Sequence, residues 1–407
     1  MSGDETGPGG FLRIACICSG LLGVAAMLAA CAGDGVAQSM GPEPIAVAFE
    51  DDPEEAPGDP TTYLDNLRHA SYSGAKRDPD PIVLKADPAP LQGLNPARKT
   101  IGELSFVAGF HLTSDEKRFG GLSGIDVLDD GNLLAVSDKG DFVWIDLADD
   151  GVTPKAARLS AMNDAKGKPF PSKGEGDAEG LAITDGLALV SFEGNNRILA
   201  YDIGACGAAA RGIPLGWSLT KAFARGKLSV GGNNGVEALA ITPDGYLVAG
   251  IEMKAGKASP LSARPVERGA DFSLRIGEGA PEIVGLDLLP AGDHGQDVHA
   301  FSLHRSTSPL ASNAITVMET DFERYLDQAN LPAKIVSEAD ERSHYRFRQT
   351  ASRALAEMNV LLTIDNFEGL AAKELPDGRV RLFIVSDDNF SASQRTLLMV
   401  FDAAKRG

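Results

Sequence analysis

The stretch Ala178-Glu-Gly-Leu-Ala-Ile183, with the turn Asp185-Gly186 and the strand LALVSFE ending at Glu193, decides the fold. Its pattern is an apolar segment, a glycine turn and a second apolar segment that ends in an acid. The pattern occurs three more times. The other first segments are Gly121-Leu-Ser-Gly-Ile-Asp126, Val236-Glu-Ala-Leu-Ala-Ile241 and Phe367-Glu-Gly-Leu-Ala-Ala372, and the other second segments end at Asp138, Glu252 and Asp387-Asp388.

The turns between these segments are typical of β-hairpins. Asp185-Gly186, Pro243-Asp244-Gly245 and Pro376-Asp377-Gly378 supply the positive φ that a tight hairpin requires. Hairpins repeated at roughly 50-residue intervals favour an all-β fold, and they favour a β-propeller over a β-sandwich because a sandwich does not explain the repeated acid. We predict six blades, helical insertions near 322–330 and 349–358, and ring closure by Thr396–Ala403 against residues 104–107.

The N-terminus predicts export. Residues 14–30 are uncharged, apolar or small, and they have the length of a signal-peptide core rather than of a membrane span. They end in Leu28-Ala29-Ala30-Cys31, which resembles the lipobox of bacterial lipoproteins. We therefore predict a signal peptide over 1–30, lipidation of Cys31 and an outer-membrane lipoprotein that faces the periplasm or the cell surface. A cleaved signal without lipid and a retained membrane anchor are the alternatives.

Residues 31–100 are dense in Pro, Asp and Glu, as in GPEPIAVAFEDDPEEAPGDP and KRDPDPIVLKADPAP. Such a stretch cannot bury enough apolar surface to offset the entropy lost on ordering. We predict a disordered or extended linker there, with one short strand at Ile82-Val83-Leu84 on the side of the main domain. The propeller itself is predicted over 101–407.

Charge and cysteine content narrow the partners. The formal net charge of −19 repels nucleic acid, so membrane contact is expected only through the lipid on Cys31. Cys16, Cys18 and Cys31 lie at the N-terminus, which leaves Cys206 alone in the body. Neither a disulfide framework nor a cysteine zinc site can be built from one cysteine.

Further motifs accompany the repeat. They are Phe119-Gly-Gly-Leu-Ser-Gly-Ile125 with Ala135-Val-Ser-Asp-Lys-Gly140, Asp177-Ala-Glu-Gly-Leu181 with Val190-Ser-Phe-Glu193, Asn233-Asn-Gly-Val-Glu-Ala-Leu239, Asp365-Asn-Phe-Glu-Gly-Leu370, and Val385-Ser-Asp-Asp-Asn-Phe-Ser391 with Gln394-Arg-Thr396. Over residues 103–405 the chain thereby resembles the phytase-like family, known as "esterase-like activity of phytase". The resemblance implies a six-bladed propeller related to calcium-dependent phytases, with phosphoester-hydrolysing or esterase-like activity.

The chain departs from that family pattern around residues 292–314. Thr307-Ser-Pro-Leu310 keeps part of the expected Thr-Asp turn, and Ala311-Ser-Asn313 replaces the expected Pro-Asp-Gly pair. Residues 316–322 still fit a blade strand that carries Glu319.

Repeated acids at equivalent strand ends of a propeller converge on one mouth of its central channel. Crowded carboxylates repel one another unless a cation neutralises them, and calcium accepts six to eight oxygens in flexible geometry. Magnesium demands a tighter octahedron, and zinc is disfavoured because none of the six histidines lies in the repeats. We predict a Ca²⁺ site and, within it, three catalytic carboxylates. The predicted metal ligands are Asp138, Glu179, Glu193, Glu237, Glu252, Glu368 and Asp387. Glu319 ends a strand at the same repeat position as Asp138, Glu193, Glu252 and Asp387. The predicted catalytic residues are Glu179, Glu237 and Glu368.

Basic residues beside these acids suggest a phosphate clamp, because an arginine fork matches phosphate oxygens. The predicted substrate-binding residues are Arg118, Lys139, Arg197 and Arg395. The alternative for each is an ion pair with the adjacent acid, and the alternative for the acids is bonding to backbone amides. We therefore predict a calcium-dependent phosphoester hydrolase, or an esterase, that acts on a small substrate.

Two other functions compete with this prediction. A serine nucleophile has little support, because Ile125 stands where a G-x-S-x-G elbow needs its last glycine and no histidine accompanies Ser137, Ser191 or Ser386. A non-catalytic, envelope-anchored binding module stays open. Convergence of the acids on one pocket would favour the enzyme.

Overall fold

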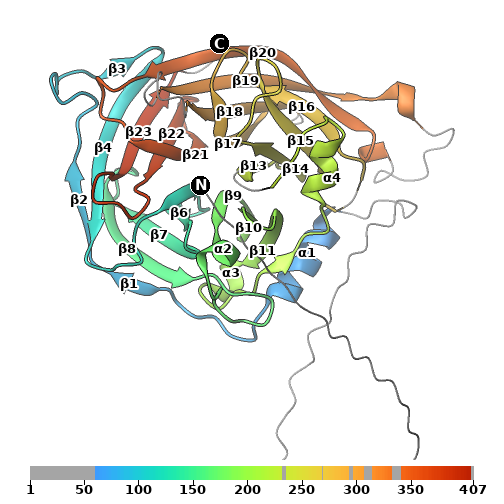
Figure 1. The fold of residues 1–407 in the computed structure, drawn as a ribbon, viewed down its shortest axis with the longest axis horizontal. Coiled ribbons are helices and arrows are strands. Elements are labelled where there is room, and N and C mark those ends of the chain that lie inside the picture. The colour runs from blue at the N-terminus through green and yellow to red at the C-terminus, as the bar shows by residue number, and fades with distance from the viewer. Residues whose placement is uncertain are drawn as a thin grey trace, which may run out of the picture. The chain divides into compact units, whose positions relative to one another are not determined.

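In the computed structural model the repeated hairpins form antiparallel sheets arranged around a central axis (Figure 1). The structure describes residues 60–231, 235–267, 269–292, 297–306, 314–331 and 341–404, all within the compact unit Ala46–Gly407. These residues form five sheets. Their innermost strands follow one another around the axis, and the last packs beside the first. The fold is a five-bladed β-propeller.

Each blade is one sheet, and its strands follow one another from the axis outward. Blade 1 contains β5 (Leu122–Val127), β6 (Leu133–Ser137), β7 (Asp141–Leu147), β8 (Pro154–Ala161) and β1 (Asp80–Ile82). Blade 2 contains β9 (Ala178–Thr184), β10 (Leu187–Phe192), β11 (Arg197–Asp202) and β12 (Ile213–Pro214). Blade 3 contains β13 (Val236–Ile241), β14 (Tyr246–Ile251), β15 (Ser259–Pro265) and β16 (Phe272–Ile276).

Blade 4 contains β17 (Glu282–Ala291), β18 (Asp297–Arg305), β19 (Ile315–Leu326) and β20 (Tyr345–Met358). Blade 5 contains β21 (Asn366–Glu374), β22 (Val380–Asp387), β23 (Thr396–Ala403), β4 (Leu104–Ser114) and β2 (Leu84–Pro88), and β3 (Thr100–Ile101) pairs with β4. Short helices α2 (Lys173–Gly176), α3 (Ile203–Cys206) and α4 (Leu219–Ala224) connect strands.

The prediction of six blades is wrong, and blade 4 gives the reason. Its outer strands β19 and β20 are long and pair with each other, so they use residues that a sixth blade would have needed. The helices predicted near 322–330 and 349–358 are also wrong, because these residues continue the two strands and only a 3-10 turn, η1 (Gln328–Asn330), follows. Pairing along the sheet overrides the local helical pattern.

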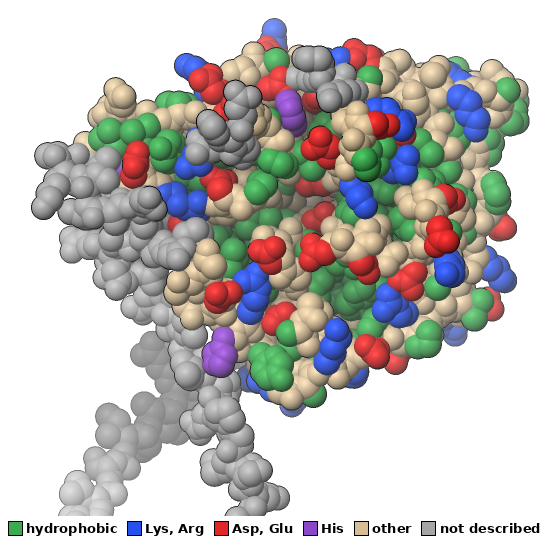
Figure 2. Space-filling view, turned by 180° about the vertical axis from the view of Figure 1, so that it is seen from behind, with side chains coloured by type: hydrophobic (Ala, Val, Ile, Leu, Met, Phe, Trp, Pro, Cys, Tyr) green, Lys and Arg blue, Asp and Glu red, His purple; other side chains and the backbone are tan. Residues whose placement is uncertain are grey.

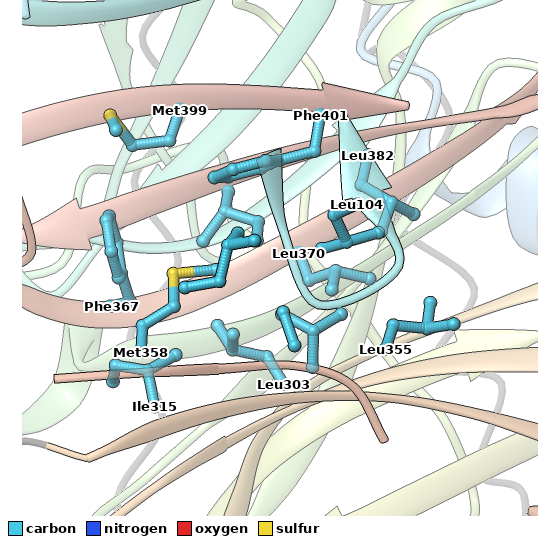
Figure 3. Packing of buried hydrophobic residues seen from close by; sticks show 14 of the residues in the cluster. Leu104, Leu303, Ile315, Leu355, Met358, Phe367, Leu370, Leu382, Met399 and Phe401 are labelled. Carbon is cyan, nitrogen blue, oxygen red and sulfur yellow. The ribbon is translucent and has the colours of Figure 1, made fainter. Parts of the chain in front are cut away.

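Ring closure occurs where the sequence predicted it. Strand β23 pairs with β4 so that Ala403 lies opposite Leu104 and Phe401 opposite Phe106. Blade 5 therefore joins strands from the two ends of the domain. The sheets bury apolar side chains between blades, as Figure 3 shows for the packing of Leu303 and Ile315 from blade 4 with Leu370 and Phe401 from blade 5.

The linker predicted over 31–100 departs from the structure in its second half. Residues 60–71 form α1 (Pro60–Ser71), whose Leu67 is fully buried against blade 2. The Ser71 hydroxyl donates to the carbonyl of Arg211 and accepts from the amide of Asp202. The apolar residues Tyr63, Leu64 and Leu67 lie at helical spacing, and this pattern outweighs the polar composition. The short strand expected at 82–84 is present as the adjoining β1 and β2.

Several sequence predictions lie outside the described residues. These include the signal peptide, Cys31, Asn233 and the segment 307–313. Among the residues that are described, no helix has the length and apolar character needed to span a membrane.

Candidate metal centre at one mouth of the axial channel

A β-bulge interrupts every innermost strand at the same place. In blade 1, Leu122 lies opposite Ser137 and Gly124 opposite Val136, so Ser123 is the extra residue. A bulge re-aims a side chain, and here it turns one residue per blade toward the axis. The five residues at this position are Ser123, Glu179, Glu237, Val284 and Glu368.

The glycine that follows the bulge in four blades is required by close packing. A Cβ on Gly124 would lie 2.5 Å from the carbonyl oxygen of Glu179, and one on Gly369 would lie 2.9 Å from that of Ser123. Each such glycine lets the backbone of the neighbouring blade pack closely against its own strand. The repeated Glu-Gly-Leu motif therefore has a physical meaning: an axial side chain, a close backbone contact and a core residue.

A second ring of side chains lies at the ends of the neighbouring strands. In each blade, the residue just before the bulge pairs with a residue of the second strand. The residue that comes next along the second strand after this partner belongs to the second ring. The five residues of this ring are Asp138, Glu193, Glu252, Arg305 and Asp387. All seven acids predicted as metal ligands thus lie at one end of the axis, which we call the upper mouth.

Glu179 and Glu237 are the least compensated of these acids. Burial raises the pKa of Glu179 well above its usual value, and the charges of Glu237 and Glu368 raise it further. Burial raises the pKa of Glu237 in the same way, and the charge of Glu368 raises it further. Within the described residues, no hydrogen bond or ion pair reaches either carboxylate.

Three acids of blade 2 form a group that fits a metal ion. One carboxylate oxygen from each of Asp177, Glu179 and Glu193 lies within 4.8 Å of the others. The amide of Glu193 donates to the carbonyl of Asp177, which fixes the two acidic residues side by side. An all-carboxylate donor set suits a hard cation such as calcium. Asp138, also at this mouth, has a buried Oδ1 that finds no hydrogen-bond partner in the described part of the chain.

Two basic residues, Arg305 and Lys173, pair with acids at this mouth, and the sequence pattern did not reveal either of them. The two outer nitrogens of Arg305 donate to Glu368 at 2.5 Å and to Glu252 at 2.9 Å. Lys173 on α2 pairs with Asp138, and its Nζ lies 3.4 Å from Asp177. Asn366 adds a hydrogen bond of 2.8 Å to Glu368.

Burial lowers the pKa of Arg305, but the charges of Glu368 and Glu252 outweigh this effect and raise it above its usual value. Burial still raises the pKa of Glu368 to about 8 despite the arginine. Burial likewise raises the pKa of Asp387 to about 6, although the hydrogen bond donated by the amide of Asn389 lowers it.

The four predicted substrate-binding cations divide into two pairs. Arg118 is bound to the buried carboxylate of Asp141, and Arg395 pairs with Asp365 at 3.0 Å, so both follow the salt-bridge alternative. Lys139 lies over the ring of Phe390, and the Arg197 guanidinium lies 4.4 Å from the centroid of Phe192. Neither of these two makes an ion pair in the described part of the chain.

Glu319 does not belong to the ring. It lies on the third strand of blade 4, where Arg353 on β20 donates to it at 2.8 and 3.0 Å. Arg305 occupies the ring position that Glu319 was expected to fill. Glu319 does form a group with His299 and Asp321, but its carboxylate is already neutralised by Arg353.

The opposite end of the axis, the lower mouth, is hollowed into a pocket of about 330 Å³. Asp126 and Asp287 line it, and each carboxylate accepts two backbone N–H groups at 2.6–2.7 Å. A second and much smaller space, of about 10 Å³, is lined by inner-strand residues that include Leu239 and Leu370 together with the axial Glu237 and Glu368, so the channel is narrow there. Figure 2, which views one face of the ring, shows acidic side chains around and within a central hollow.

The fold and the upper mouth together define the class of this protein: an all-β propeller with a carboxylate-lined axial site. Residues 117–390, more than half of the chain, match the family described as "Phytase-like: Esterase-like activity of phytase". The chain belongs to this phytase-like family. Comparison with curated protein sequences finds no match.

Solved structures of other proteins are distantly similar to this chain. The PQQ-bound aldose sugar dehydrogenase of Streptomyces coelicolor is 14% identical, with 80% of this chain and 100% of that chain covered and a TM-score of 0.38. The glutaminyl cyclase of Myxococcus xanthus is 11% identical, with 74% and 97% covered and a TM-score of 0.37. Similarities this distant carry no inference about the chemistry of this chain.

Proposed function

We propose that this protein is a calcium-dependent hydrolase of phosphoester bonds, or of other ester bonds, that acts at the upper mouth. One observation carries the proposal. Glu179 and Glu237 lie at the upper mouth without a bonded cation among the described residues, and Glu179 belongs to the group of three carboxylates that is spaced for one ion. Leaving them so would be costly, because like charges in a poorly solvated site repel strongly.

The ion would be held by Asp177, Glu179 and Glu193, with Glu237 beside them. A calcium ion bound there would polarise a phosphoryl or carbonyl oxygen and lower the pKa of a bound water. Lys139 and Arg197 are the rim cations without a carboxylate partner among the described residues, so we assign them to the substrate phosphate. Arg118 and Arg395 instead hold their acids in place.

Export and anchoring are a separate part of the proposal. The lipobox ending at Cys31 would place the enzyme on the cell envelope, with the residues between Cys31 and α1 as its tether. A small soluble substrate of that compartment would then reach the upper mouth by diffusion.

The test is hydrolysis of p-nitrophenyl phosphate, bis-p-nitrophenyl phosphate and p-nitrophenyl acetate by the purified chain, with calcium and with EGTA. We expect turnover of at least one substrate in calcium and its loss in EGTA. An absence of metal-dependent turnover on all three would contradict the hydrolase. Thermal stabilisation by calcium without turnover would favour the binding module.

A pair of variants locates the site. Glu179→Gln with Glu237→Gln should lower the calcium-dependent rate at least roughly 100-fold, because two axial carboxylates are lost. The matched control is Glu319→Gln, which removes the acid that lies outside the ring and should leave the rate unchanged. Equal rates in the double variant and the wild type would mean that the active site lies elsewhere in the protein.

A further inference from the structure

Arg305 stands where four other blades place an acid. The equivalent residues are Asp138, Glu193, Glu252 and Asp387, and each directly follows the second strand of its blade or ends it. Blade 4 therefore reverses the charge at one position of the ring.

The guanidinium of Arg305 is bound by acids of the ring and is largely shielded from solvent. The Arg305 side chain is 12% exposed, and its two outer nitrogens contact Glu252, Glu368 and Asn366. Its Nε is buried and has no hydrogen-bond partner among the residues that the structure describes. A substrate phosphate would have to displace these carboxylates, so the geometry does not suit a phosphate clamp.

We propose that Arg305 is a built-in cation that takes the place of one metal ion. It neutralises the sector of Glu252 and Glu368 permanently, which leaves the sector of Asp177, Glu179 and Glu193 for an external ion. The inference rests on the proposed function for the external ion, but what is new in it is the role of the Arg305 guanidinium. Removing the charge of Arg305 should create a second ion site.

Calorimetric titration of the full chain with calcium chloride, after removal of metal with EGTA and desalting, tests this claim. Arg305→Met should bind one more calcium ion than the wild type. In EGTA it should melt about 5 °C or more below the wild type, because two carboxylates lose a buried partner, and calcium should restore most of the loss. Arg305→Lys keeps a charge and should bind the wild-type number of ions.

The matched control is Arg395→Met, which breaks an ion pair with Asp365 outside the ring and should not add an ion. If Arg305→Met does not fold in EGTA, the double variant Arg305→Met/Glu368→Gln decides. Its ring charge equals that of the wild type, so it should melt close to the wild type and bind the same number of ions. Melting as low as the single variant would mean that the arginine acts by packing, and the proposal would be overturned.

The two failures are distinguishable. A wild type that binds no calcium and has no turnover refutes the proposed function, whereas a gain of one ion in Arg305→Met would still support the built-in cation. Equal ion numbers in the wild type and in Arg305→Met refute the built-in cation and leave the hydrolase untouched.

Discussion

The two mouths of the axial channel treat acidic residues in opposite ways. At the lower mouth, Asp126 and Asp287 each accept two backbone amides, which also join neighbouring blades: Asp126 bonds Ile183 and Asp287 bonds Ala372. At the upper mouth, Glu179 and Glu237 accept none in the described structure. Satisfied acids stabilise a fold, and unsatisfied acids are kept where a ligand can satisfy them. This contrast is the one expected if the proposed function belongs to the upper mouth and the lower mouth serves stability.

The largest expected effect that tests this contrast is a loss of stability at the lower mouth. Asp126→Ala removes the acceptors of the Val127 and Ile183 amides and should cost roughly 2 kcal/mol, because buried donors lose their partners. Alanine already occupies the equivalent position in three blades, as Ala182, Ala240 and Ala371, so the backbone itself accepts the change. Urea unfolding measures the cost.

The same variant should keep its calcium response, because it lies beyond the narrow part of the channel. Asp129→Ala, at the exposed turn beside the same pocket, is the control and should change stability by less than about 0.5 kcal/mol. A calcium response lost in Asp126→Ala would show that the two mouths act as one site.

How far the sequence predicted this contrast depends on the kind of pattern involved. The Glu-Gly-Leu repeat places Glu179, Glu237 and Glu368 on the axis, because bulge, close contact and core residue recur together. Arg305 was not predicted as a site residue, because the repeated feature is an acid at the strand end and the equivalent strand of blade 4 ends in a base. Asp177 lies within a recognisable motif, but the sequence did not indicate that its carbonyl accepts a hydrogen bond from the amide of Glu193 and that its carboxylate lies near those of Glu179 and Glu193.

The blade count and the N-terminal segment escaped for a different reason. Four hairpin repeats are visible, but the number of blades depends on how many residues each sheet consumes. Strands β19 and β20, of 12 and 14 residues, are the two longest in the described sheets, so blade 4 consumes more residues than blade 2 or blade 3. Helix α1 was hidden by its polar composition, since only Tyr63, Leu64 and Leu67 reveal the face that packs on blade 2. Composition predicted disorder where a few well-placed apolar residues were enough for packing.

The pH dependence of stability sharpens the comparison. The pKa of Glu368 is raised to about 8 from 4.5 and that of Asp387 to about 6 from 3.8. Their protonated forms favour the folded state, so without calcium this contribution is complete below roughly pH 4 and declines as pH rises toward about 8. Asp287, with a pKa of about 7, follows the same trend at the lower mouth.

Calcium should reverse the trend at the upper mouth only, because the ion binds the ionised carboxylates. We expect the calcium-induced rise in melting temperature to be several degrees larger at pH 8 than at pH 5. Each additional kcal/mol of unfolding free energy raises the melting temperature by roughly 2–4 °C. Thermal melts in calcium and in EGTA at both pH values measure it. A rise of equal size at pH 5 and pH 8 would show that the bound groups do not titrate in this range.

The smallest expected effect concerns Lys173, whose side chain is 54% exposed. Its ammonium lies 3.4 Å from Asp177, a member of the proposed metal group, so it competes with calcium for that carboxylate. Lys173→Gln should therefore tighten calcium binding by up to about fivefold, because an exposed ion pair contributes at most about 1 kcal/mol.

Salt distinguishes this effect from that of Arg305. Added sodium chloride screens an exposed charge, so the difference between Lys173→Gln and the wild type should shrink at high salt, whereas the extra ion of Arg305→Met should persist. Lys139→Gln is the control, since Lys139 has no carboxylate partner in the described structure. Weaker calcium binding by Lys173→Gln would mean that the lysine orients Asp177, and the upper mouth would then depend on a cation on its rim as well as on Arg305 within its ring.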